Sequence, residues 1–168
     1  MITYKVGDLI EALKTGEVNA IGHQANCFCT MNSGVAKAIK LNFKDAWDAD
    51  QETEKGDRTK LGDSSVGAHY REDRDVGLIY NLYGQYNYGY DAAGYTDYDS
   101  LEKALISMRD DLLSATHIMP EYLKVGFPKI GAGLGGGDWD TIEAIIKSVF
   151  ADPEWNVTIY ILKLEETK

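Results

Sequence analysis

The chain has 168 residues, of which 44% are apolar and 26% are charged, and this composition is ordinary for a globular domain with a single core. Lys and Arg number 17 against 27 Asp and Glu, and the net charge of −10 disfavours nonspecific binding to nucleic acid, whose phosphates require basic neutralisation. No apolar run approaches the ~18 residues of a membrane helix, and the first residues, MITYKVGD, lack the features of a secretory signal. We therefore expect one domain over residues 1–168, monomeric and cytoplasmic, without membrane contact.

Strand and helix patterns alternate along the chain. In chain order they predict a strand over 2–6, a helix over 9–15, a strand over 18–26, a helix from Ser33, a helix over 44–56, strands near 64–70 and 76–83, a helix over 97–117, a strand over 122–127, a helix after Asp138 and a strand over 156–164. Asp8 is expected to cap the first helix and Gly16 to end it. The segment 84–98 has too many glycines for a helix and is expected to form a long loop.

This alternation predicts an α/β fold with a mixed, mostly parallel sheet that carries helices on both faces. The strand over 18–26, VNAIGHQAN, is largely uncharged, as expected for a strand that is buried on both of its faces. It delivers His23 and Asn26 to its carboxyl end. Ligands of such folds bind beyond the carboxyl ends of strands, so this is the end at which a site is expected.

Two segments share the order strand, small-residue loop, helix. The first passes through Asn32, Ser33 and Gly34, and the second passes through GAGLGGG, residues 131–137. Glycines let a backbone approach a diphosphate closely, and the N-terminus of the following helix adds partial positive charge. Two such loops could clamp one diphosphate, although a glycine-rich segment can also be a plain surface turn. Neither loop matches the Walker A pattern or the dinucleotide fingerprint.

The cysteines, Cys27 and Cys29, lie two residues apart near a predicted strand end. This spacing suits neither a disulfide framework nor a four-ligand zinc site, so reduced thiols are expected. The sequence predicts no metal and no cofactor.

Three motifs resemble the signatures of the macrodomain family: GDLIEA near the start, GHQANCFCTMNSGVAKAI in the first loop and FPKIGAGLGGGDW in the second. The resemblance covers almost the whole chain and looks closest to the branch of ADP-ribose 1''-phosphate phosphatases and terminal ADP-ribose protein glycohydrolases. It implies a three-layer α/β/α fold and ADP-ribose, or a derivative of it, as the ligand.

The resemblance also implies roles for individual residues. Asp8 would bind the adenine amino group and Asn26 the distal ribose, although Asp8 could serve as a helix cap and Asn26 could satisfy backbone groups at the strand end. The implied ligand contacts are Asp8, Leu9, Asn26, Asn32, Ser33, Gly34, Val35, Gln85, Ile130, Gly131, Ala132, Gly133, Leu134, Gly135 and Gly136. Gln85 belongs to a tyrosine-rich loop whose rings could cover the ligand or pack against the sheet.

His23 matches a histidine that is implicated in catalysis in the phosphatase-type relatives, and a neutral-pH proton carrier suits phosphate-ester cleavage. The alternative is a histidine that simply bonds a neighbouring strand. The glycohydrolase relatives use a lysine from the third strand and an aspartate in the second loop, whereas this chain offers no lysine in SSVGAHYRE and has Gly135 at the loop position.

These residues favour a metal-independent hydrolase that converts ADP-ribose 1''-phosphate to ADP-ribose and phosphate. Two alternatives remain: a hydrolase that removes ADP-ribose or an O-acetyl group from other substrates, and a reader that binds ADP-ribose without turnover.

Overall fold

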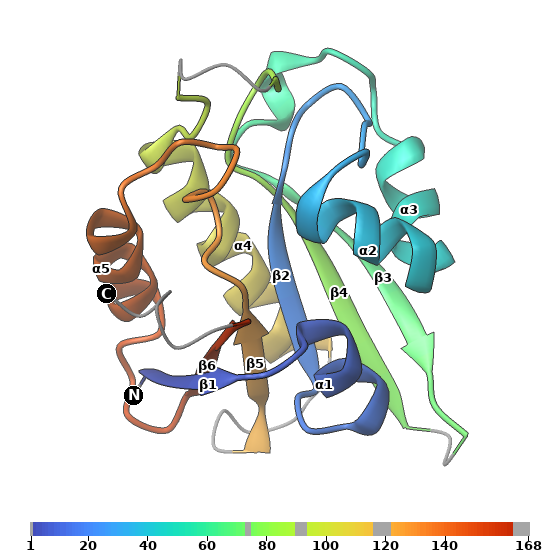
Figure 1. Cartoon of the computed structure of the whole chain (residues 1–168), viewed down its shortest axis with the longest axis vertical. Coiled ribbons are helices and arrows are strands. Elements are labelled where there is room, and N and C mark those ends of the chain that lie inside the picture. The colour runs from blue at the N-terminus through green and yellow to red at the C-terminus, as the bar shows by residue number, and fades with distance from the viewer. Residues whose placement is uncertain (1, 73–74, 90–93, 116–121, 163–168) are drawn as a thin grey trace.

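A computed structural model describes residues 2–72, 75–89, 94–115 and 122–162 of the chain. Its centre is a six-stranded sheet in the order β1-β6-β5-β2-β4-β3, in which β3 runs antiparallel to β4 and the other neighbours are parallel (Figure 1). The strands are β1 (Ile2–Val6), β2 (Ala20–Ala25), β3 (Ser64–Tyr70), β4 (Val76–Tyr83), β5 (Lys124–Phe127) and β6 (Asn156–Ile161). The predicted mixed, mostly parallel sheet is therefore confirmed.

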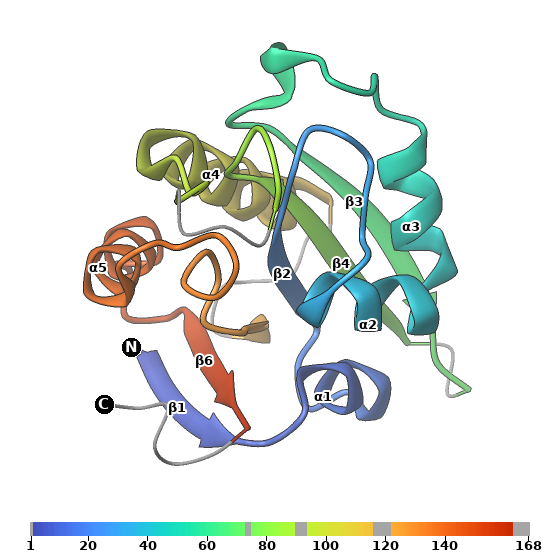
Figure 2. The same cartoon turned by 45° about the horizontal axis from the view of Figure 1, so that its top comes forward.

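Helices cover both faces of this sheet. They are α1 (Leu9–Thr15), α2 (Gly34–Asn42), α3 (Lys44–Gln51), α4 (Tyr98–Ala115) and α5 (Trp139–Val149), and a short 3-10 helix, η1 (Arg58–Lys60), precedes β3. Helices α1, α2 and α3 lie on one face, and α4 and α5 lie on the other (Figures 1 and 2). None of the helices in the described ranges combines the length and the apolarity that a membrane crossing requires.

Two hydrophobic clusters separate the three layers. Leu101, Leu105 and Met108 of α4 pack with α5 against one face of the sheet, whereas Leu13 of α1 and Ile39 of α2 pack against the other. Strand residues alternate between the clusters, since side chains along a strand point to opposite faces in turn. The three-layer α/β/α arrangement expected from the family resemblance is thus confirmed.

Some element boundaries differ from those predicted. The helix expected over 44–56 ends at Gln51, because the chain then turns back toward the loop after β2, where the Gly56 N–H donates to the Cys27 carbonyl over 2.7 Å. Gly56 takes a φ of +81°, which glycine adopts without strain. The strand expected from residue 122 begins at Lys124. Residues 116–117 and 163–164, the ends of a predicted helix and a predicted strand, lie outside the described residues.

Gly67 of β3 provides a test of this packing, since a Cβ built there would lie 2.4 Å from the Ala46 backbone nitrogen in α3. A clash with backbone cannot be relieved by rotating a side chain. We expect Gly67→Ala to lower the free energy of unfolding by about 1–3 kcal/mol in urea denaturation. Gly133→Ala is the matched control, because its Cβ would meet nothing within 4 Å, and it should unfold like the unmodified protein. Equal stability of the two variants would contradict the close packing of α3 on β3.

Candidate functional site

The two loops singled out from the sequence follow neighbouring strands. Ala20 and Ile21 of β2 pair with Val125 and Gly126 of β5, so both strands end at the same edge of the sheet. The connection after β2 leads to α2 on one face, and the connection after β5 leads to α5 on the opposite face (Figure 2). Diverging connections leave a crevice between neighbouring strand ends, and this is where open α/β sheets bind ligands.

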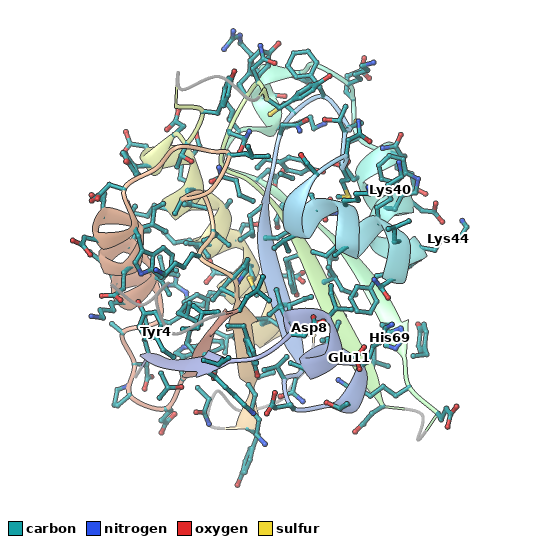
Figure 3. All side chains as sticks on the ribbon, viewed as in Figure 1. Tyr4, Asp8, Glu11, Lys40, Lys44 and His69 are labelled. Carbon is teal, nitrogen blue, oxygen red and sulfur yellow. The ribbon has the colours of Figure 1, made fainter. Side chains whose placement is uncertain are left out.

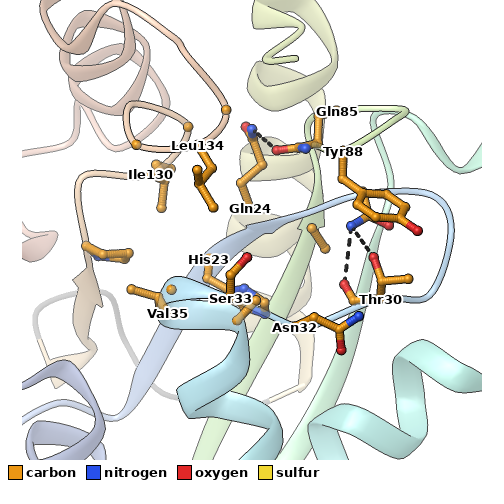
Figure 4. Close-up of a pocket in the computed structure, with 18 of the residues that line it drawn as sticks. His23, Gln24, Thr30, Asn32, Ser33, Val35, Gln85, Tyr88, Ile130 and Leu134 are labelled. Carbon is orange, nitrogen blue, oxygen red and sulfur yellow. Dashed lines mark hydrogen bonds between the residues drawn. The ribbon is translucent and has the colours of Figure 1, made fainter. Parts of the chain in front are cut away.

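A cleft of about 490 Å³ occupies this position. The predicted site residues that line it are His23, Asn26, Asn32, Ser33, Gly34, Val35, Gln85, Ile130, Gly131, Gly133, Leu134 and Gly135. Residues 32–35 of the first loop and 130–135 of the second lie on opposite sides of it (Figure 4). The fold therefore brings the two loops together around one cavity.

Four predicted contacts do not line this cleft: Asp8, Leu9, Ala132 and Gly136. Asp8 lies at the start of α1, where its Oδ1 accepts a hydrogen bond from the Ile10 N–H at 2.8 Å (Figure 3). Leu9 is buried in the cluster beneath α1. The Ala132 N–H donates to the Lys129 carbonyl, and a Cβ on Gly136 would lie 2.9 Å from the Cα of Gly94. Ligand contacts by these four residues stay predictions.

Helix α2 begins without a capping side chain. Asp8 caps α1 and Asp138 caps α5 through their carboxylates, but Ser33, the N-cap of α2, makes no side-chain bond to the helix. The N–H groups of residues 34–36 have no hydrogen-bond partner among the described residues. An uncapped helix N-terminus carries partial positive charge and free donors, which suits an anion.

The second loop also presents free donors. Its Ala132, Gly136 and Gly137 N–H groups donate to carbonyls within the segment 129–133. By contrast, the N–H groups of residues 133–135 have no partner in the part of the chain that the structure describes, and these residues line the cleft. Consecutive free N–H groups in a turn form a concavity that binds anions.

The glycines of this loop have different reasons for being glycine. A Cβ on Gly133 would meet nothing within 4 Å, so this residue faces open space. A Cβ on Gly135 would lie 2.6 Å from Thr96 Oγ1, and a Cβ on Gly131 would lie 3.0 Å from Gln24 Oε1. Gly133 therefore leaves room for a ligand, whereas Gly131 and Gly135 leave room for protein side chains.

His23 is 1% exposed, and its Nε2 lies 2.7 Å from Asn81 Oδ1. The Asn81 Nδ2 donates to the Ala46 carbonyl, which can only accept, so Oδ1 faces the histidine and His23 Nε2 must carry the proton. Burial lowers the His23 pKa to about 4. The neutral imidazole keeps a lone pair on Nδ1, which has no partner among the described residues. This geometry favours the alternative of a histidine that bonds a neighbouring strand.

The side-chain amides of Asn26 and Gln85, which are predicted to contact the ligand, already form hydrogen bonds within the protein. Asn26 donates to the Thr30 carbonyl and hydroxyl and accepts from the Phe28 N–H, so it shapes the turn after β2. Gln85 accepts from the Gln24 amide at 2.7 Å and donates to the Asn87 carbonyl. The exposed Asn32 side chain and the half-buried Ser33 hydroxyl, which both line the cleft, make no hydrogen bond to other described residues.

Sequence reasoning missed several residues that line the cleft: Gln24, Ala25, Thr30, Ala36, Gly89, Pro128 and Lys129. It expected a ring of the tyrosine-rich loop near the ligand without choosing one, and Tyr88 of that loop lines the cleft. The strand periodicity could have identified Gln24, since it is the last polar residue of β2 that faces the side opposite to His23. Lys129 is the one charged side chain among the described lining residues, and its Nζ lies 5.8 Å from the centre of the Trp139 ring. No group of three or more His, Cys, Asp or Glu side chains in the described ranges is arranged to hold a metal ion.

The burial of His23 should make stability depend on pH. The ordinary pKa is 6.5 and the folded-state pKa is about 4, so between these values the unfolded chain binds a proton that the folded chain does not. We expect His23 to lower the free energy of unfolding as pH falls from 6.5 to 4, by at most ~1.4 kcal/mol per pH unit. Urea denaturation across this range should show a shallower loss for His23→Gln. Identical pH dependence in both proteins would contradict a buried, neutral His23.

No protein-family model matches the chain. It is 34% identical over 151 residues to an uncharacterised 17.5 kDa protein in the tk-vs intergenic region of Enterobacteria phage T4, covering 87% of this chain and 88% of the phage protein. It is 26% identical over 162 residues to the human ADP-ribose glycohydrolase OARD1, covering 96% of this chain and 91% of the human protein.

Solved structures share the fold. The macrodomain of Mycobacterium tuberculosis DarG superposes with a TM-score of 0.72 at 22% identity, covering 95% of this chain and 97% of that one. Thermosipho africanus DarTG in complex with ADP-ribose gives 0.65 at 18% identity, covering 98% of this chain and 42% of that one. The strand order, the paired loops at neighbouring strand ends and these relatives lead to one conclusion, that the chain belongs to the macrodomain family.

Proposed function

We propose that the protein binds ADP-ribose in the cleft and hydrolyses a bond at the distal ribose. The observation that carries the proposal is the pair of facing N–H runs, residues 34–36 and 133–135, that have no partner among the described residues. A diphosphate placed between them accepts hydrogen bonds from both loops. DarTG, whose structure contains ADP-ribose, shares the fold that creates this arrangement.

Main-chain donors also explain how a protein with a net charge of −10 holds an anion. Peptide N–H groups offer partial positive charge at fixed positions and add no net charge. Among the described lining residues only Lys129 is charged, and it lies in the segment that leaves β5. The diphosphate is therefore recognised mainly by backbone.

We propose that the two ends of ADP-ribose bind at opposite ends of the cleft. We assign the distal ribose to the end lined by Asn26, Asn32 and Tyr88, and the adenosine to the end formed by residues 128–130. In this assignment Asp8, at the start of α1, binds the adenine amino group. Its Oδ1 caps the helix, and its Oδ2, which has no hydrogen-bond partner among the described residues, is available to the adenine amino group.

We propose ADP-ribose 1''-phosphate as the substrate, with release of phosphate. A second candidate is the removal of ADP-ribose from a larger molecule, which is supported by the human and bovine relatives named ADP-ribose glycohydrolase. In both reactions we place the broken bond at C1'' of the distal ribose. One site can perform both by adding water at C1'' and releasing the substituent.

His23 enters this chemistry as a neutral group. Because its pKa is about 4, His23 lacks the second ring proton that an imidazolium could donate at neutral pH, and its one remaining proton, on Nε2, is donated to Asn81. The monoanionic form of the ester, in which one phosphate oxygen already carries a proton, releases HPO₄²⁻ when the C1''–O bond breaks, so this cleavage needs no general acid from the protein. Attack at phosphorus would place negative charge where the distal end of the cleft has no charged side chain among the described residues.

Binding is tested by calorimetry with ADP-ribose. We expect the unmodified protein to bind and Gly133→Glu to show no detectable binding, because the variant places bulk and negative charge in the space reserved for the diphosphate. Leu41→Glu is the matched control: it adds the same charge on α2 at a side chain that is 72% exposed and does not line the cleft. Full affinity in Gly133→Glu would contradict the assigned diphosphate position.

Turnover is tested by incubation with ADP-ribose 1''-phosphate in ¹⁸O-labelled water. We expect phosphate release with no ¹⁸O in the phosphate, since the water oxygen joins C1'', the C1''–O bond breaks with its electron pair leaving on phosphate, and the water proton passes to solvent. Mass spectrometry of the phosphate checks this. Labelled phosphate would contradict attack at C1'', and binding of ADP-ribose without any phosphate release would contradict the proposed substrate.

A further inference from the structure

A polar network joins β2 to both sides of the cleft. The Gln24 Nε2 donates to Gln85 Oε1 at 2.7 Å and to Thr96 Oγ1 at 2.9 Å (Figure 4 shows the first bond). Gln85 and Thr96 are the first and last residues of the segment 85–96, which includes Tyr88 of the cleft wall. One side chain of β2 thus contacts both ends of this segment.

Thr96 transmits the network to the second loop. Its hydroxyl lies 2.8 Å from the Gly131 carbonyl and 3.2 Å from the Gly135 carbonyl, and its N–H donates to the Gly135 carbonyl at 3.0 Å. The Tyr95 N–H adds a further bond to Gly135 at 2.7 Å. Thr96 does not line the cleft, so both carbonyl oxygens are held toward a residue outside it. These carbonyl oxygens carry partial negative charge that would repel a phosphate, and their bonds to Thr96 hold them away from the cleft.

The loop is shaped to receive these two side chains. A Cβ on Gly135 would lie 2.6 Å from Thr96 Oγ1 and 2.9 Å from Gln24 Nε2, and a Cβ on Gly84 would lie 2.5 Å from Gln24 Oε1. Gln24 Oε1 is buried and has no partner among the described residues. A buried amide oxygen without a hydrogen-bond partner lowers the stability of the folded protein. Packing alone therefore does not explain why Gln24 occupies this position.

We propose that Gln24 and Thr96 are positioning residues that hold the second loop with its 133–135 N–H groups open to the cleft. The inference rests on the proposed function for its ligand, and it adds that the diphosphate site is preset by side-chain hydrogen bonds from Thr96, which does not line the cleft, and from Gln24, which lines it. Preset donors bind an anion without the cost of ordering the loop at the moment of binding.

The test compares Thr96→Val with Thr96→Ser. Valine keeps the shape and the backbone bonds but removes the hydroxyl, whereas serine keeps the hydroxyl. We expect ADP-ribose to bind Thr96→Val about tenfold more weakly by calorimetry, the effect of losing one hydrogen bond that connects the network, and to bind Thr96→Ser with nearly full affinity. Gln24→Met, which keeps length and removes both polar atoms, should weaken binding similarly. Full affinity in folded Thr96→Val would overturn the proposal.

A second readout needs no ligand. In ¹⁵N-resolved NMR spectra of the unliganded proteins, the amide signals of residues 133–135 should shift in Thr96→Val and Gln24→Met and stay in place in Thr96→Ser. Unchanged signals in both apolar variants would overturn the network even if one variant were too unstable for calorimetry. If the unmodified protein failed to bind ADP-ribose, the proposed function would fall, while the shifts would still decide whether these residues set the loop.

Discussion

The proposed site depends on backbone N–H groups that have no hydrogen-bond partner within the described part of the chain. Peptide groups in a folded protein are nearly always paired, because an unpaired buried donor costs free energy. Here two runs, residues 34–36 and 133–135, lie at the same edge of the sheet and find no acceptor among residues 2–72, 75–89, 94–115 and 122–162. Their exposure to the cleft lets solvent satisfy them when no ligand is bound, so the protein can keep an anion site without a large loss of stability.

Sheet topology places the two runs opposite each other. Since β2 and β5 are neighbours, their loops start side by side, and since α2 and α5 lie on opposite faces, the loops diverge. A helix after each strand on the same face would have closed the space between them. The cleft is therefore a consequence of strand order and of which face each helix covers, and the loop sequences determine only what it binds.

Much of this was predictable from local pattern. Periodicity and turn residues located the strands and helices, and the caps at Asp8 and Asp138 were correctly expected. Both loops follow the carboxyl ends of strands, and in a mostly parallel sheet these ends share the edge at which ligands bind. The sequence therefore indicated that the two loops lie near one site. What local pattern could not supply was the partner of each polar side chain. His23 pairs with Asn81 across 58 residues of sequence, and no spacing signals that contact.

The second loop illustrates why composition alone misassigns roles. The run GAGLGGG suggests that each glycine serves the ligand, yet only Gly133 among those considered faces open space. Gly131 and Gly135 yield their volume to Gln24 and Thr96, which come from distant parts of the sequence. A glycine can thus be needed because a Cβ at its position would collide with a neighbouring side chain. In our proposal the anion site is therefore shaped in part by Thr96, a side chain outside the cleft, whose hydroxyl bonds to the carbonyls of the loop that presents the N–H groups.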